Sequence, residues 1–545
     1  MKKTGFLLLA SALLVSLLAG CSGANSKKED PAKNDPKPAE NNPATEQKEA
    51  AYPASFSYWV GLNGNVAATL ADYSELKVYK KLEENTGTKV EFKHPSTDPA
   101  QAEEQFNLMI ASGNYPDVIE KSWLVSGKGP DALIEDGTLI RLNELIDQHA
   151  PNIKKYLSEH PEIEKMIKTD SGNIYAFPFI RGDNELMVFF GPIIRQDWLE
   201  KLNLEEPATI EEWEKVLTAF RDGDPNGNGK KDEIPYLLNY RNVRSGATNE
   251  LIGAWGIAAQ FYQVNGKVMY GEIQPEYKQF LETMQRWYKE KLIDPDFAAT
   301  DGKLQDAKVT GDQLGSLYTY NGGGLGKYTD LMKDKPGFKL IGVSHPSLVK
   351  GEISALGQVD KPYTGLGAAI TKTSKNPEQI VKWLDWGYSE EGNMAFNFGI
   401  EGESYEMVDN YPKYTDKITK NPDGLPMAQS LSQYARSTSN GPFIQDIRYL
   451  EQYLQKDTQK EALKKWSQAK NEIVLPPITL TAEESKRMAS IMGDANTYAE
   501  EMMLKFIMGA ESLDKFDDFV ATMKSFGIDE AVKIQQTAMD RYFAR

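Results

Sequence analysis

Alternating strand and helix signals near the start of the globular part restrict the folds that this chain can form. An aromatic run at residues 56–60 is typical of a buried strand, and a helical pattern follows it up to a stop signal at 85–87. Residues 89–92 predict a second strand, and a helix at 102–112 precedes a third strand at 117–119. This order predicts an α/β fold with a largely parallel sheet, in which ligands bind at the carboxyl ends of the strands.

The N-terminus has the pattern of a secretion signal that ends at a cysteine. Two lysines precede an apolar stretch at 5–18, which is shorter than the roughly 20 apolar residues of a membrane-spanning helix. Small residues stand directly before Cys21, as a signal peptidase requires, and the thiol can accept a lipid. We therefore expect residues 1–20 to be a lipoprotein signal peptide and Cys21 to be anchored at the outer face of the cell membrane. An ordinary signal peptide followed by a chance cysteine is the alternative.

Composition separates a tether from a large globular part. Residues 22–51 contain no large apolar side chain, so we expect a disordered tether over 21–51. Cys21 is the only cysteine of the 545 residues, which excludes an intrachain disulfide and a thiolate metal cluster. The net charge is −17, or −19 without the two lysines of residues 1–20. Such a charge disfavours nucleic acid and anionic membrane surfaces as partners.

A glycine-rich acidic segment at 224–233 has the ligand spacing of a calcium loop. Oxygen-bearing side chains occupy positions 1, 3, 5 and 9, and glycine occupies position 6, as in an EF-hand. The main-chain carbonyl of Lys230 can serve at position 7. Pro235 replaces the acid expected at position 12, and Glu233 stands at position 10, which indicates a calcium loop of another fold. A solvated turn that binds no ion is the alternative.

Aromatic residues near Gly, Asn or Pro are candidates for sugar contact, and we expect them in loops. Flat rings suit the C–H faces of sugars, and Asn, Asp and Arg side chains suit the hydroxyl groups. We expect the loops after Val60 and Ile119 to contribute to this site. Phe177 and Tyr320 share the pattern, whereas the tryptophans in helical patterns are predicted to be core residues: Trp213, Trp287, Trp383 and Trp386. The candidate ligand residues are Trp59, Asn63, Trp123, Tyr175, Arg181, Trp255, Tyr318 and Tyr405.

Recognisable catalytic motifs are missing from the sequence. The glycine cluster at 322–327 lacks the Walker spacing, so we interpret it as a flexible or hinge-near loop. Three of the four histidines precede proline, which favours turns, and neither HExxH nor GxSxG occurs. We therefore expect a protein that is not an enzyme. The 79 acidic residues still offer carboxylate pairs, so a surface glycoside hydrolase or lyase remains an alternative.

Several stretches of the sequence resemble one known family. The N-terminal signal, the strand at 56–60, and residues 195–235, 368–392 and 397–406 resemble the family 1 extracellular solute-binding lipoproteins of Gram-positive bacteria, in the branch that includes alginate-oligosaccharide-binding proteins. The resemblance implies an α/β fold of two lobes, as in periplasmic binding proteins, with a hinge and an interlobe ligand cleft. It also implies a structural calcium ion with the ligands Asp224, Asn226, Asn228, Lys230 (through its carbonyl), Asp232 and Glu233.

The resemblance further implies the lobe boundaries and the function. A first lobe would comprise 52–178 with a returning segment near 345–440, and a second lobe would comprise 179–344 with about 441–545. We expect a monomeric receptor that captures an oligosaccharide and delivers it to an ABC transporter, with two permease subunits and a separate ATPase as partners. A peptide-binding receptor is a further alternative, and the pattern does not identify the sugar.

Overall fold

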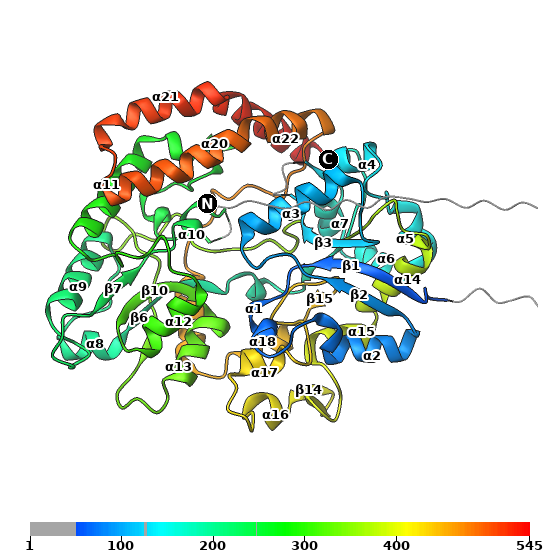
Figure 1. The fold of residues 1–545 in the computed structure, drawn as a ribbon, viewed down its shortest axis with the longest axis horizontal. Coiled ribbons are helices and arrows are strands. Elements are labelled where there is room, and N and C mark those ends of the chain that lie inside the picture. Colours follow the sequence, from blue (N-terminus) through cyan, green and yellow to red (C-terminus); the bar gives the residue numbers. More distant parts are fainter. Residues whose placement is uncertain (1–50, 125–127, 247) are drawn as a thin grey trace, which may run out of the picture. The chain divides into compact units, whose positions relative to one another are not determined.

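The computed structural model describes residues 51–124, 128–246 and 248–545 (Figure 1). The predicted signal peptide, Cys21 and almost all of the predicted tether lie outside the described residues. Within the described ranges, none of the helices combines the length and the apolar composition that a membrane span requires.

A five-stranded sheet, called the first sheet below, has the order β2–β1–β3–β12–β4. Parallel pairing joins β1 to β2 and β3, which confirms the three predicted strands. The expected parallel pattern is wrong for β12, which pairs antiparallel with both β3 and β4. The strands are β1 (Ser55–Val60), β2 (Lys89–Lys93), β3 (Val118–Ser122), β4 (Phe177–Pro178) and β12 (Leu366–Ile370). Helices packed in this part include α2 (Lys77–Thr86), α3 (Pro99–Ser112), α5 (Asn143–His149), α6 (Pro151–Glu159) and α14 (Pro377–Asp385).

A four-stranded sheet, called the second sheet, has the order β11–β6–β10–β7. Its strand β10 is parallel to β7 and antiparallel to β6. The strands are β6 (Phe190–Arg195), β7 (Ile234–Leu237), β10 (Leu314–Tyr320) and β11 (Leu340–Gly342). The neighbouring helix α9 (Ile210–Asp222) begins with a capping box, in which the Thr209 hydroxyl accepts from the Glu212 N–H and the Glu212 carboxylate accepts from the Thr209 N–H.

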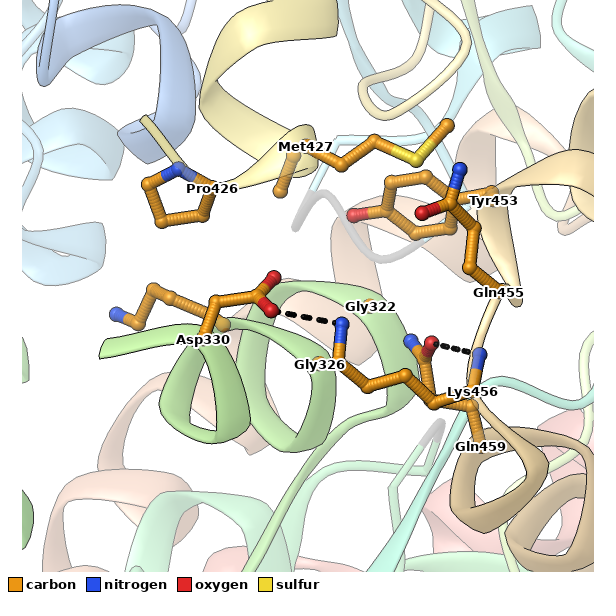
Figure 2. A pocket seen from close by; sticks show the side chains of 11 residues that line it. Gly322, Gly326, Asp330, Pro426, Met427, Tyr453, Gln455, Lys456 and Gln459 are labelled. Carbon is orange, nitrogen blue, oxygen red and sulfur yellow. Dashed lines mark hydrogen bonds and ion pairs between the residues drawn. The ribbon is translucent and has the colours of Figure 1, made fainter. Parts of the chain in front are cut away.

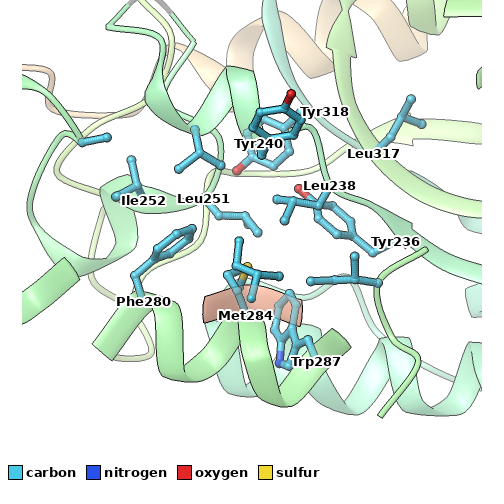
Figure 3. Close-up of a cluster of buried hydrophobic side chains, with 14 of the residues drawn as sticks. Tyr236, Leu238, Tyr240, Leu251, Ile252, Phe280, Met284, Trp287, Leu317 and Tyr318 are labelled. Carbon is cyan, nitrogen blue, oxygen red and sulfur yellow. The ribbon is translucent and has the colours of Figure 1, made fainter. Parts of the chain in front are cut away.

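Aromatic side chains fill the core of the second sheet. Trp213 of α9 and Trp287 of α11 (Pro275–Lys289) are fully buried and meet Tyr236 of β7 edge to face, with ring centroids 6.0 and 6.3 Å away. Figure 3 shows Tyr236, Trp287 and Tyr318 in one cluster. The helical tryptophans are all buried, so the prediction that they belong to cores is confirmed: Trp213, Trp287, Trp383 and Trp386.

The chain passes between the two sheets several times, and these crossing segments pair with one another. It leaves the first sheet after β4 and returns to it after β11. Beside the crossings, β5 (Ile180–Arg181) pairs in parallel with β15 (Ile444–Gln445). A smaller third core, drawn from residues 398–454 and Leu186, includes the hairpin of β13 (Tyr405–Val408) and β14 (Tyr411–Tyr414).

The C-terminal part of the chain is helical. It contains α20 (Ala482–Met508), α21 (Phe516–Phe526) and α22 (Ile528–Ala544). Helix α20 packs on α11 beside the second sheet and on α4 (Pro130–Glu135), which follows β3 of the first sheet. The C-terminal helices therefore contact one helix beside the second sheet and one helix that follows β3 of the first sheet (Figure 1).

Candidate functional site

The predicted calcium loop joins α9 to β7 and curls around its own oxygen atoms. The carboxylate of Asp224 accepts from the main-chain N–H groups of Asn228 and Gly229, at 3.1 and 3.2 Å. The side-chain oxygen of Asn228 accepts from the Lys230 N–H at 2.7 Å. Gly227 and Gly229 adopt φ angles of 73° and 74°, a region that favours glycine. This backbone brings the side chains of alternate residues to the inside of the loop.

The surroundings of the Glu233 carboxylate indicate whether this loop suits a cation. Its Oε1 atom is buried and has no hydrogen-bond partner among the described residues. Burial raises the pKa of Glu233, and the charges of Asp224 and Asp232 raise it further. A buried carboxylate oxygen without a partner, close to two other carboxylates, is the environment that a hard divalent cation would stabilise.

The remaining donors of the loop are amide and carbonyl oxygens. The described residues contain no cluster of three or more acidic, histidine or cysteine side chains spaced for a metal, so a cation here would also need Asn and main-chain oxygens. Hydrogen bonds from the amides of Asn228 and Asn226 lower the pKa of Asp232 and keep it charged. The chemistry of this donor set fits calcium. The residues that would hold it are Asp224, Asn226, Asn228, Lys230, Asp232 and Glu233.

The loop is attached to the beginning of two strands of the second sheet. Asn226 donates to the Asp312 carbonyl at 3.2 Å, and the Ile234 N–H donates to the Gln313 carbonyl at 2.8 Å. These contacts fix the start of β7 and β10, whereas the carboxyl ends of both strands lie at the opposite edge of the sheet. A cation in this loop would therefore stabilise the sheet without lying at the carboxyl ends of its strands, the edge at which α/β sheets generally bind ligands.

The carboxyl ends of β1 and β10 approach each other, although they belong to different sheets. After β1, the Asn63 side chain caps the short helix α1 (Gly64–Ala67) by accepting from the Asn65 N–H at 2.9 Å. After β10, the chain forms the wide helical turn η5 (Asn321–Gly326). A Cβ atom on Gly323 would lie 3.7 Å from the Asn65 side-chain nitrogen. The predicted loop after Val60 thus faces a turn of the second sheet.

The glycine cluster, interpreted as a flexible or hinge-near loop, forms a helical turn, so the prediction of a loop is wrong. Residues 321–326 form one π-type turn, and a Cβ atom on Gly322 would lie 1.7 Å from the Tyr453 ring. Figure 2 shows the small cavity beside this turn, where Asp330 forms an ion pair with Lys456 at 2.8 Å. The cavity measures about 10 Å³, which is room for about one water molecule and not for a sugar ring.

Several predicted ligand aromatics are buried in the cores. The expectation that they lie in loops is confirmed for Trp123 and Tyr175 and is wrong for those that lie in strands. Trp123 is fully buried, and its ring N–H donates to the Gly367 carbonyl at 2.9 Å. The hydroxyl of Tyr175 pairs with that of Tyr363 at 2.7 Å. Trp255 is in the 3-10 turn η3 (Ile252–Trp255). The aromatic residues that lie in strands are Trp59 in β1, Phe177 in β4, Tyr318 and Tyr320 in β10, and Tyr405 in β13.

The predicted ligand residues do not form one group. Trp255 packs in the core of the second sheet, where its ring meets Phe280 edge to face at 5.2 Å, and Tyr318 lies in the same core. Tyr405 packs in the third core. Burial explains the difference, because Gly, Asn and Pro also flank buried strand ends and so do not indicate an exposed ring.

Three predicted ligand residues remain partly accessible: Trp59, Asn63 and Arg181. The half-buried ring of Trp59 packs on Phe106, with centroids 6.1 Å apart. Arg181 is held in a crossing segment, where its Nε donates to Asp360 at 2.7 Å and its Nη1 donates to Gln445 at 2.9 Å. Sequence reasoning did not select Asp360 or Gln445, because partners so distant along the chain leave no local signal.

Known proteins are similar to this chain over most of its length. A family model described as bacterial extracellular solute-binding protein matches residues 67–394. The chain is 27% identical to the fructooligosaccharide ABC transporter substrate-binding protein FusA of Streptococcus pneumoniae, over 87% of this chain and 88% of that protein. It is 25% identical to lipoprotein LipO of Bacillus subtilis, over 83% and 87% of the two chains. A solved structure of the alginate-binding protein AlgQ2 without calcium ion matches with a TM-score of 0.76 at 27% identity, over 89% of this chain and 98% of that one.

Proposed function

Because the chain belongs to the bacterial extracellular solute-binding protein family, we propose that it captures an oligosaccharide outside the cell and delivers it to the permease of an ABC importer. The similarity to FusA over most of both chains carries this proposal. The names of FusA and AlgQ2 state that these relatives bind a fructooligosaccharide and alginate, which are both carbohydrates. The predicted fold class, an α/β fold of the two-lobed binding-protein type, is confirmed.

Each sheet with its helices is proposed as one lobe. The core of the first sheet contains residues of 56–180 and 363–396 together with Phe443, and that of the second contains residues of 188–356 and 462–531. This grouping supports a division near 178 between a first lobe of 52–178, with a return near 345–440, and a second lobe of 179–344, with about 441–545. Leu356 in the second core and Phe443 in the first core lie on the other side of the later boundaries. The third core extends across the boundary near 440. The ligand would bind where the carboxyl ends of β1 and β10 meet.

Calcium is proposed to bind at residues 224–233 and to act on stability. The unsatisfied Glu233 oxygen and the inward-facing Asn and Asp side chains support this assignment. When bound, the ion would neutralise the three carboxylates and order the start of β7 and β10. The residues themselves hold the turn and attach it to the sheet.

For the ligand, Trp59, Asn63 and Arg181 are proposed as contact residues. The buried members of the predicted set are proposed to affect ligand binding only indirectly, because they pack in the cores that position the site: Trp123, Tyr175, Trp255, Tyr318 and Tyr405.

Lipid attachment at Cys21 gives a direct prediction. Replacement of Cys21 by Ser removes the acceptor thiol, so the protein is expected to be released into the medium or to remain unprocessed. Membrane fractionation and mass spectrometry of the N-terminus measure this. A Cys21→Ser chain that is processed normally and stays in the membrane fraction would contradict lipid anchoring. The similarity to LipO, which is named a lipoprotein, supports the proposal.

Titration calorimetry with a panel of oligosaccharides and peptides tests the proposed ligand class. The chain without residues 1–20 is expected to bind at least one oligosaccharide with one site per chain. A peptide that binds while every glycan fails would favour a peptide receptor and contradict the proposal.

A further inference from the structure

Tyr320 is an exposed aromatic residue at the end of an otherwise buried strand. It is the last residue of β10 and is 52% exposed, whereas the six strand residues before it are buried. Its ring lies parallel to that of Phe189, at 6.0 Å and 5°, and meets Phe190 edge to face at 5.1 Å. Two rings therefore support Tyr320 from the protein side and leave a large part of it open to solvent.

Hydrogen bonds fix the main chain of Phe189 and Phe190, whose rings pack against Tyr320. The main-chain N–H groups of Phe189 and Phe190 donate to the fully buried side chain of Gln358, at 2.7 and 3.1 Å. The N–H of Asn321, next to Tyr320, donates to the Phe189 carbonyl at 2.8 Å. A ring that is held in this way loses little entropy when a ligand stacks on it.

The two charged side chains near Tyr320, Arg181 and Asp360, neutralise each other. The guanidinium of Arg181 stacks on the Phe189 ring at 4.4 Å, and Asp360 pairs with that guanidinium. Burial raises the pKa of Tyr320, the charge of Asp360 raises it further, and the charge of Arg181 lowers it. The phenol is therefore neutral, and the two charged groups nearest to it are paired with each other.

The neighbours of Tyr320 come from the segments that connect the two sheets. Arg181 belongs to β5, Phe189 precedes β6, and Asp360 lies between β11 and β12. The side-chain nitrogen of Asn65, in helix α1 after β1, lies close to the turn that follows Tyr320. A molecule on this ring would thus lie near the second sheet, the crossing segments and helix α1.

We propose that Tyr320, supported by Phe189, is a stacking site for an uncharged sugar ring at the crossing between the two sheets. This inference rests on the proposed oligosaccharide-binding function and adds a contact residue and a ligand class to it. An aromatic face suits the C–H face of a sugar, and the Asn65 amide and the Asp360 carboxylate offer partners for hydroxyl groups. A uronate would bring a negative charge beside an arginine that Asp360 already neutralises, so the site favours a neutral ring.

Calorimetry on variants of the chain without residues 1–20 tests this site. The probes are neutral fructo-, gluco- and galacto-oligosaccharides and, separately, trimers of galacturonate and of alginate. Tyr320→Ala is expected to weaken the binding of a neutral oligosaccharide by about tenfold or more, because a central stacked aromatic contributes strongly to affinity. Tyr320→Phe keeps the ring and is expected to weaken binding by about two- to fivefold, the effect of losing one neutral hydrogen bond of average strength.

Phe543→Ala is the matched control, because Phe543 is a 66% exposed aromatic on α22 that lies outside the proposed site. It is expected to leave the affinity unchanged. Thermal melting checks that Tyr320→Ala folds. A Tyr320→Ala chain that binds the neutral sugar as tightly as the unaltered chain would overturn the stacking site. Tighter binding of a uronate trimer than of every neutral glycan would overturn the ligand class. If the unaltered chain binds no glycan at all, the proposed function itself fails.

Discussion

Replacing Arg436 by methionine is expected to destabilise the first sheet by about 3–5 kcal/mol, the usual cost of removing one partner of a buried ion pair. Arg436 is 1% exposed, and its two Nη atoms lie 3.0 and 2.7 Å from the carboxylate oxygens of Glu120, which is 4% exposed. Glu120 lies on β3 of the first sheet and also accepts from the Tyr58 hydroxyl at 2.7 Å. Without Arg436, the carboxylate would remain buried with no compensating charge.

Thermal unfolding followed by circular dichroism measures the effect. A loss of this size should lower the midpoint by roughly 6 °C or more if the first lobe unfolds as a unit of about 200 residues. Glu120→Gln together with Arg436→Met should recover part of the loss, because no charge is then left buried. Lys215→Met is the control, since its pair with Glu211 is exposed and such pairs contribute little. A midpoint for Arg436→Met equal to that of the control would contradict the importance of this pair.

Removal of calcium is expected to lower the unfolding midpoint as well. A ligand that binds only the folded state stabilises it by about 2.7 kcal/mol at a hundredfold excess over Kd. Without the ion, the carboxylates of Asp224, Asp232 and Glu233 repel one another, and the buried Glu233 oxygen has no partner. A chelator should therefore lower the midpoint of the unaltered chain, and added calcium should restore it.

Variants separate this effect from a general loss of acidic charge. Asp224→Ala with Asp232→Ala should remove the response to the chelator and leave oligosaccharide affinity close to that of the unaltered chain, because the loop lies at the opposite end of β7 and β10 from the proposed ligand site. Asp416→Ala, at an exposed carboxylate, should keep the full response. An unchanged melting curve in chelator, with no calcium in elemental analysis, would leave only a solvated turn at residues 224–233.

Local patterns predicted the parts of this fold that depend on local physics. The strands at 56–60, 89–92 and 117–119 are present because apolar and β-branched side chains suit a buried sheet. The reversed strand β12 was not predicted, because its direction depends on a long return from the second sheet.

The candidate ligand site was less predictable than the fold. Tyr318 and Tyr320 are two residues apart on β10 and look alike in the sequence, yet the first is buried and the second is half exposed. Tyr320 is exposed because it is the last residue of the strand, and only the tertiary structure shows where the strand ends. Arg181 was selected as a ligand residue, which stays a prediction, and its partner Asp360 is 179 residues away. No spacing rule connects residues that the chain brings together by crossing between two sheets.

We infer that this protein binds an oligosaccharide without altering it. Native mass spectrometry of the chain without residues 1–20, incubated overnight with the glycan that calorimetry selects, tests whether the glycan stays intact. We expect a complex with the mass of one chain and one intact glycan, and recovery of the glycan at its original mass after the complex is dissociated. Shorter glycans or unsaturated products that accumulate in proportion to protein and time would contradict it and would identify a hydrolase or a lyase.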